Sequence, residues 1–168
     1  RVTEEIVGLT VARNLAEEIY PARLGSGLVA WISLDEHTDW FGGHAQVRAD
    51  MCRLTLERAE DGSVDVDVLV LEGKLRQLYD GHGVVQVRRT CDFFRSVLGG
   101  PGREVARHVD ENMWREQIAV AVENLPADAI QIVSAEVSRD PDAEAELMHR
   151  TMSDFRSGSI RLRAINGV

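Results

Sequence analysis

The alternation of apolar and polar residues is most regular from Val64 to Leu75, which reads V-D-V-D-V-L-V-L-E-G-K-L. Apolar side chains at every second position predict a β-strand with one buried face. That face carries four valines, and the same alternation then places Glu72 and Lys74 on it. A charge on a buried face is costly unless it is paired or binds a metal, so the end of this strand is the first candidate site.

Helical spacing of apolar residues predicts a helix from Thr3 to about Tyr20, before strands over Leu28–Leu34 and Val47–Ala59. The apolar stripe of this helix consists of Val2, Ile6, Leu9, Ala12, Ala16 and Ile19. Glu5 falls within the stripe, so it is either a ligand that points at the sheet or a first-turn carboxylate favoured by the helix dipole. The loop over 35–46 is long enough to serve as a flap, and its acidic and histidine residues match no metal-ligand spacing.

The turn before the central strand sets which residues face each other. Glu60-Asp61-Gly62 suits a three-residue hairpin loop whose glycine takes the left-handed conformation. With that loop Ala59 pairs with Ser63, and Asp50 lies opposite Glu72 with both side chains on one face. A two-residue turn would shift the register by one residue and put Asp50 on the wrong face.

The second half of the chain mixes helices and strands. Helices are predicted from about Val84 to Leu98 and from about Arg103 to Pro126 with a restart at Asp110, strands at Ala129–Val137 and Ser159–Ile165, and helix with loop at Asp140–Phe155. The pattern predicts one α/β domain over residues 1–168, with a mixed central sheet flanked by helices. Because the sequence starts at Arg1 rather than Met, we expect a module cut from a longer polypeptide.

Composition narrows the class of protein. The hydrophobic fraction of 44% and the charged fraction of 28% are typical of a soluble globular protein, and no apolar run approaches the length of a membrane span. Cys52 and Cys91 are too few for a disulfide framework or an iron–sulfur cluster, so we expect reduced core residues in a cytoplasmic protein.

The charge is unevenly distributed. A net charge of −9 argues against autonomous binding of duplex phosphate, yet residues 74–107 hold seven basic and three acidic residues, which leaves −13 for the remainder. This segment is either where an anionic partner approaches or a solvated helix face with incidental arginines. Of the 19 basic residues, Lys74 is the only lysine, and it stands two positions after Glu72.

One spacing pattern resembles a known family. An Asp, then about twenty residues later a Glu-x-Lys tripeptide that ends an apolar strand, then a Gln twelve residues after the Lys, resembles the PD-(D/E)xK nuclease superfamily. The resemblance is closest to its RecB-like branch and covers roughly residues 3–98. It implies a restriction-endonuclease-like core with the element order α-β-β-β-α-β. Thr90 stands where the branch has a Tyr, and this departure removes a phenol from the motif.

The resemblance also implies a site for Mg²⁺ or Mn²⁺. Carried over to this chain, the metal ligands would be Asp50, Glu72, the carbonyl of Gly73 and Glu5, and the further catalytic residues Lys74 and Gln86. Carboxylates and a carbonyl form the oxygen-rich environment that these ions prefer. The ion would polarise the scissile phosphate and lower the pKa of bound water, while the ammonium of Lys74 offsets charge that develops on phosphorus.

We therefore expect a metal-dependent DNA nuclease, with Arg76, Arg88 and Arg89 in contact with DNA. The stretch Leu71–Thr90 also resembles nuclease-like segments of large bacterial ATPase-linked antiphage restriction proteins, including those linked to DNA phosphorothioation. That likeness implies a role in bacterial defence beside the remainder of an ATPase-containing chain. Two alternatives stay open: a catalytically inactive scaffold that binds nucleic acid or a partner protein, and a small-molecule sensory domain, for which nothing in the sequence indicates a cavity.

Overall fold

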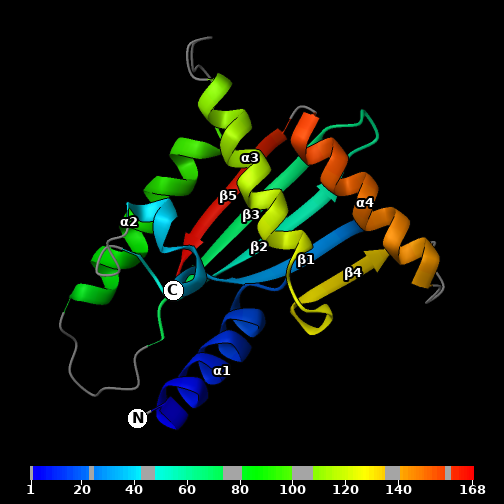
Figure 1. Cartoon of the computed structure of the whole chain (residues 1–168). Helices are drawn as coiled ribbons and strands as arrows, with labels where there is room; N and C mark the ends of the chain where they lie inside the picture. Colours follow the sequence, from blue (N-terminus) through cyan, green and yellow to red (C-terminus); the bar gives the residue numbers. More distant parts are fainter. Residues whose placement is uncertain are drawn as a thin grey trace.

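The computed structural model describes residues 2–22, 25–42, 48–73, 81–99, 108–134, 141–157 and 160–168. The helices are α1 (Val2–Ile19), α2 (His82–Val97), α3 (His108–Glu123) and α4 (Pro141–Ser157), with 3₁₀ helices η1 (Leu34–Phe41) and η4 (Ala127–Ala129). The strands are β1 (Ser26–Ser33), β2 (Met51–Arg58), β3 (Val64–Leu71), β4 (Ile130–Ser134) and β5 (Ile160–Gly167). They form a five-stranded mixed sheet flanked by helices (Figure 1), which confirms the predicted α/β class.

The strand order in the sheet is β4-β1-β2-β3-β5. Strands β1, β2 and β3 form an antiparallel meander, β4 pairs antiparallel with β1, and β5 pairs parallel with β3. A parallel neighbour requires a crossover connection, and the chain between β3 and β5 contains α2, α3 and α4. Among the described helices, none has both the length and the apolar character needed to span a membrane.

The predicted hairpin register is confirmed. The N–H of Ala59 donates to the carbonyl of Ser63 at 2.9 Å, and Gly62 has a φ of 79°, so the loop has three residues with glycine in the left-handed region. Met51 then pairs with Leu71. The third strand ends at Leu71, and positions 74–75 of the predicted strand lie outside the described residues.

The main core lies between the sheet and the three helices α2, α3 and α4. The four valines of β3 are buried there against Phe94 of α2, Ile118 of α3 and Phe155 of α4. Cys52 and Cys91 are buried free thiols in the same core, as predicted. Burial raises the pKa of both thiols, so neither is suited to act as a thiolate nucleophile.

The opposite face of the sheet is covered in part by α1. Ala16 packs there against Trp31 of β1 and Leu69 and Leu71 of β3. The predicted burial of Ile19 is wrong, since its side chain is 53% exposed. The last turn of α1 overhangs a pocket instead of resting on strand side chains, and Ile19 lines that pocket.

The segment after β1 is not an open flap in its first half, which corrects the prediction for 35–41. It forms η1, whose Leu34 and Trp40 are buried. The Trp40 ring stacks on His37 with centroids 4.3 Å apart and meets Trp114 of α3 edge-on at 6.4 Å. These ring contacts hold η1 against the body of the domain, while His44 lies outside the described residues.

Candidate active site

The candidate site lies at the end of the sheet where β1, β3 and β5 finish and β2 begins. The C-terminus lies at this end, beside η1 and α2 (Figure 1). The antiparallel strands of the meander return the chain to this end, so residues far apart in sequence meet here.

Asp50 is held in direct contact with the tripeptide that follows β3. The backbone N–H of Gly73 donates a hydrogen bond of 2.8 Å to Oδ2 of Asp50. The carbonyl of Asp50 in turn accepts from the N–H of Leu34 at 2.9 Å. Because one bond fixes the backbone of Asp50 and the other its carboxylate, this carboxylate has a defined orientation toward the end of β3.

Glu72 is fixed by the neighbouring strand. Its backbone N–H donates to the carbonyl of Val168 at 3.1 Å, which extends the pairing of β3 and β5 past the last strand residues. The side chain is partly buried, and its Oε2 atom exposes less than 1 Å² to solvent. Met51 and Leu71 form the last pair of β2 and β3 at this end, so Asp50, just before Met51, and Glu72, just after Leu71, stand at the same end of adjacent strands.

The residues just before Asp50 are anchored to two other elements. The N–H of Ala49 donates to Oγ1 of Thr90 on α2 at 2.9 Å, and the Thr90 side chain is fully buried. Arg48 is 7% exposed and forms an ion pair with Asp35 of η1. Sequence reasoning treated Thr90 only as a missing tyrosine and gave Arg48 no role, because neither residue type at its position signals such a contact.

A glycine lets α2 cross closely over this end of the sheet. A Cβ atom at Gly167 would lie 2.2 Å from Cγ1 of Val87 and 3.4 Å from Sγ of Cys91. The helix therefore runs beside the end of β5, whose following residue, Val168, accepts the N–H of Glu72. Gln86, which is partly buried, precedes Thr90 by one helical turn and lies on the part of α2 that borders the site.

Some of the predicted site residues cannot be placed relative to Asp50 and Glu72. Lys74 and Arg76 are outside the described residues, as is the side chain of Glu5. The helix of Glu5 nevertheless reaches the site, because a Cβ atom at Gly73 would lie 2.9 Å from Cδ2 of Leu9. Arg88 and Arg89 are exposed on α2.

The described part of the chain contributes two acidic residues, Asp50 and Glu72, to this end of the sheet, which is fewer side chains than a metal site built from protein ligands alone requires. Over residues 2–73 and 81–168, with their gaps, no group of three or more His, Cys, Asp and Glu side chains gathers as a metal site. What the described chain joins here is the carboxylate of Asp50 and the backbone N–H of Gly73, the residue that follows Glu72.

Comparisons with protein-family models, with curated proteins and with solved structures gave no match. Function is therefore inferred from these residues and their geometry.

Proposed function

We propose that the chain is a metal-dependent DNA nuclease that hydrolyses phosphodiester bonds at Asp50 and Glu72-Gly73-Lys74. The observation that supports this proposal best is the hydrogen bond from the Gly73 N–H to Oδ2 of Asp50. It joins the acid before β2 to the acid-glycine-lysine tripeptide after β3, 23 residues later, as a shared catalytic site requires.

The strand arrangement supports a restriction-endonuclease-like core as part of this proposal. Helix α1, the meander β1-β2-β3 and helix α2 follow one another in the order expected, and β5 supplies a final strand parallel to β3. Helix α3, strand β4 and helix α4 are then an insertion between α2 and β5.

The donor atoms fit Mg²⁺ or Mn²⁺. Carboxylate and carbonyl oxygens are the hard ligands that these ions prefer, and both acids are positioned by backbone hydrogen bonds. Two carboxylates with water and phosphate oxygens suffice for Mg²⁺, which seldom uses an all-protein cage. A bound ion would polarise the scissile phosphate and lower the pKa of an attacking water.

The remaining roles belong to the residues of this chain. Asp50 and Glu72 would hold the ion, and the ammonium of Lys74 would offset the negative charge that grows on the phosphate. Gln86 on α2 would orient a water or a phosphate oxygen. Arg88 and Arg89, exposed on the same helix, would contact the DNA backbone as charge partners of phosphate.

A role in bacterial restriction remains a proposal from the resemblance of Leu71–Thr90. The net charge of −9 agrees with a chain that shares duplex binding with a partner polypeptide, such as an ATPase-containing one.

The proposal is tested by incubating the purified chain with supercoiled and linear DNA in Mg²⁺, Mn²⁺ or EDTA. We expect metal-dependent cleavage that falls by about 100-fold or more in Glu72→Gln and Lys74→Met. Glu60→Gln, in the exposed hairpin loop, is the matched control and should cleave like the wild type.

Binding of Mn²⁺, followed by electron paramagnetic resonance, separates the nuclease from the inactive scaffold. A wild-type chain that neither cleaves DNA nor binds Mn²⁺ favours the scaffold. Cleavage that persists in EDTA or in both variants contradicts the proposed site.

A further inference from the structure

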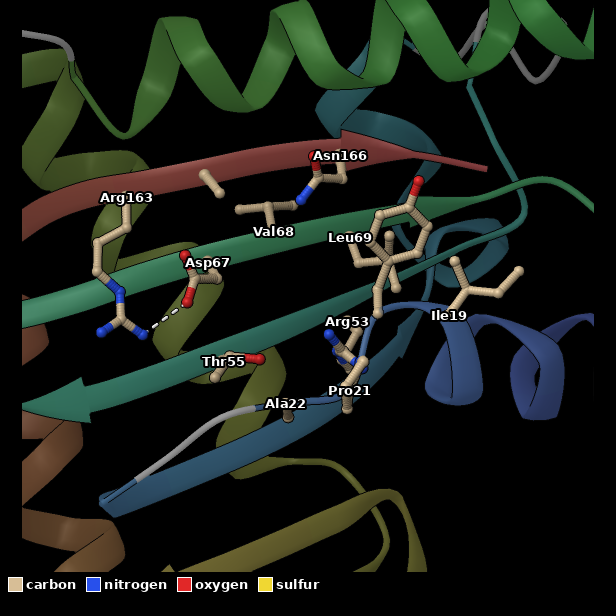
Figure 2. A pocket seen from close by; sticks show the side chains of 12 residues that line it. Ile19, Pro21, Ala22, Arg53, Thr55, Asp67, Val68, Leu69, Arg163 and Asn166 are labelled. Carbon is tan, nitrogen blue, oxygen red and sulfur yellow. Dashed lines mark hydrogen bonds and ion pairs between the residues drawn. The ribbon is translucent and has the colours of Figure 1, made fainter.

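A pocket of about 420 Å³ lies on the face of the sheet opposite to the valine core. Its floor is formed by β2, β3 and β5, and its wall by the end of α1 with the three residues that follow (Figure 2). Arg53 and Thr55 come from β2, Asp67 and Leu69 from β3, and the remaining lining residues include Tyr20, Pro21, Arg163 and Asn166. The pocket is of the size typical of small-molecule sites.

Two polar side chains are buried against this pocket. Arg53 is 6% exposed and Thr55 is 2% exposed. Neither Nε of Arg53 nor Oγ1 of Thr55 has a hydrogen-bond partner among the described residues. Buried polar atoms nearly always have a partner, so two orphan atoms on neighbouring pocket residues indicate that a ligand or ordered water completes them.

The charge of Arg53 is poorly compensated. Its guanidinium lies 5.9 Å from the centre of the Trp31 ring, and no described carboxylate is within ion-pair distance. Burial lowers the pKa of Arg53, while the more distant charges of Glu17 and Asp67 raise it. A buried cation of this kind is costly unless an anion meets it.

Arg163, on the far side of the pocket, is paired with carboxylates, unlike Arg53. Its Nη2 atom donates to Asp67 at 2.6 Å and its Nη1 atom to Glu57 at 2.7 Å. Figure 2 shows the ion pair of Arg163 and Asp67 facing the pocket from β5 and β3. Since Arg163 is already paired with three carboxylates, those of Glu57, Asp65 and Asp67, Arg53 is the lining cation that would attract an added anion.

The rest of the lining is largely apolar. Tyr20 and Pro21 line the wall of the pocket, and Leu69 is paired with Arg53 across β2 and β3. We propose that this pocket binds a small organic anion, a carboxylate or a phosphate monoester. Its charged group meets Arg53 and the hydroxyl of Thr55, and its apolar part packs against Tyr20, Pro21 and Leu69.

The pocket is separate from the candidate active site. By strand alternation Arg53 and Thr55 face away from Cys52 and Leu54, which lie in the valine core, and the pocket residues include none of the proposed nuclease residues. Binding here is therefore measured without reference to DNA cleavage, and either proposal can fail alone.

The test uses the ¹⁵N-labelled chain, titrated with hexanoate, hexyl phosphate, hexanol and inorganic phosphate while amide chemical shifts are recorded. We expect saturable shifts at pocket residues with hexanoate or hexyl phosphate, and none with hexanol or inorganic phosphate. Hexanoate and hexyl phosphate together tell which anionic group the pocket prefers, since a carboxylate and a phosphate differ in charge and shape.

Two variants and one control locate the charged contact. Arg53→Met keeps an unbranched apolar side chain but removes the guanidinium, so it should weaken binding of the preferred anion by about tenfold or more, and Thr55→Val should weaken it less. Arg13→Met is the matched control, because Arg13 also lies over Trp31, at 5.2 Å, but does not line the pocket. Equal affinity in Arg53→Met and the wild type, or no saturable shifts with either anion, overturns the proposal.

Discussion

The backbone N–H of Gly73 donates to Oδ2 of Asp50 at 2.8 Å, across the open end of the β2–β3 hairpin. The donor is a main-chain group, so its position is set by the register of the two strands rather than by a flexible side chain. That register is fixed at the other end of the hairpin by the loop 60–62. A one-residue change in this loop would turn Asp50 away from Glu72.

Asp50→Asn should remove the negative charge of residue 50 while keeping the acceptor of its hydrogen bond. The amide oxygen of Asn can still accept from the Gly73 N–H, so we expect the fold to persist, while loss of a charged ligand weakens metal binding. We predict that Mn²⁺ affinity falls and that metal-dependent cleavage drops by about 100-fold. Asp92→Asn, at an exposed position on α2, serves as the control. Unchanged Mn²⁺ affinity in Asp50→Asn would argue against this carboxylate as a ligand.

Thr90→Val should destabilise the segment that leads into Asp50. The substitution removes the acceptor of the Ala49 N–H, which would leave a buried donor unsatisfied at a cost of about 1–3 kcal/mol. Thr90→Ser keeps the hydroxyl and should cost about 1 kcal/mol, from the lost methyl group. Urea unfolding measures both values.

Thr151→Val is the matched control for this comparison. Thr151 is equally buried, but its hydroxyl donates to the carbonyl of Leu147 within α4 and satisfies no backbone N–H. The valine should therefore cost less at position 151 than at position 90. Equal costs would mean that the Ala49 bond contributes nothing specific.

The order of elements and the β2–β3 register were predictable because the signals are local. Alternating valines define β3, and Glu60-Asp61-Gly62 has a glycine where the loop requires a positive φ, here 79°. Local patterns of this kind depend on a few neighbouring residues. Asp50, Glu72 and Gly73 were therefore placed at one end of the sheet from the sequence alone.

Contacts between distant segments could not be predicted in the same way. The role of Thr90 as acceptor for the Ala49 N–H depends on how α2 crosses the sheet. That crossing brings Val87 of α2 against Gly167 of β5, and the sequence around Gly167 does not indicate this contact. The exposure of Ile19 and the burial of Arg53 both follow from a pocket whose lining comes from four elements. No spacing pattern in the sequence indicates that these four elements meet around one pocket.

Gly73→Ala should move α1 against the candidate site. The added Cβ atom would lie 2.9 Å from Cδ2 of Leu9 and 3.6 Å from Oδ2 of Asp50. Because the closest atom is the end of a flexible side chain, we expect a moderate cost of about 1 kcal/mol. In the double variant Gly73→Ala with Leu9→Ala the clash is absent. The losses in free energy of unfolding of the two single variants should therefore sum to more than the loss in the double variant.

Gly62→Ala is the contrasting case. A Cβ atom at Gly62 has no neighbour within 4 Å, and its φ of 79° makes the expected cost of about 1 kcal/mol purely conformational. Leu9→Ala should not reduce that cost. If urea unfolding gives additive values for Gly73→Ala and Leu9→Ala, the two residues do not contact each other.

Acid should destabilise the fold in part through Glu57. The N–H of Gly25 donates to Oε1 of Glu57 at 2.6 Å, and this bond, together with that from Arg163, lowers the pKa of the carboxyl below its ordinary value of 4.5. A carboxyl with a lower pKa in the folded state stabilises the fold at pH values above the unfolded pKa, and loses this contribution as the pH falls through the folded pKa.

We therefore expect the free energy of unfolding of the wild type to fall below about pH 4.5 more steeply than that of Glu57→Gln. Unfolding in urea between pH 7 and pH 3 measures the difference, with Glu60→Gln as the variant that removes one loop carboxylate without these bonds. Wild-type and Glu57→Gln curves that stay parallel down to pH 3 would mean that Gly25 and Arg163 do not stabilise the ionised carboxyl.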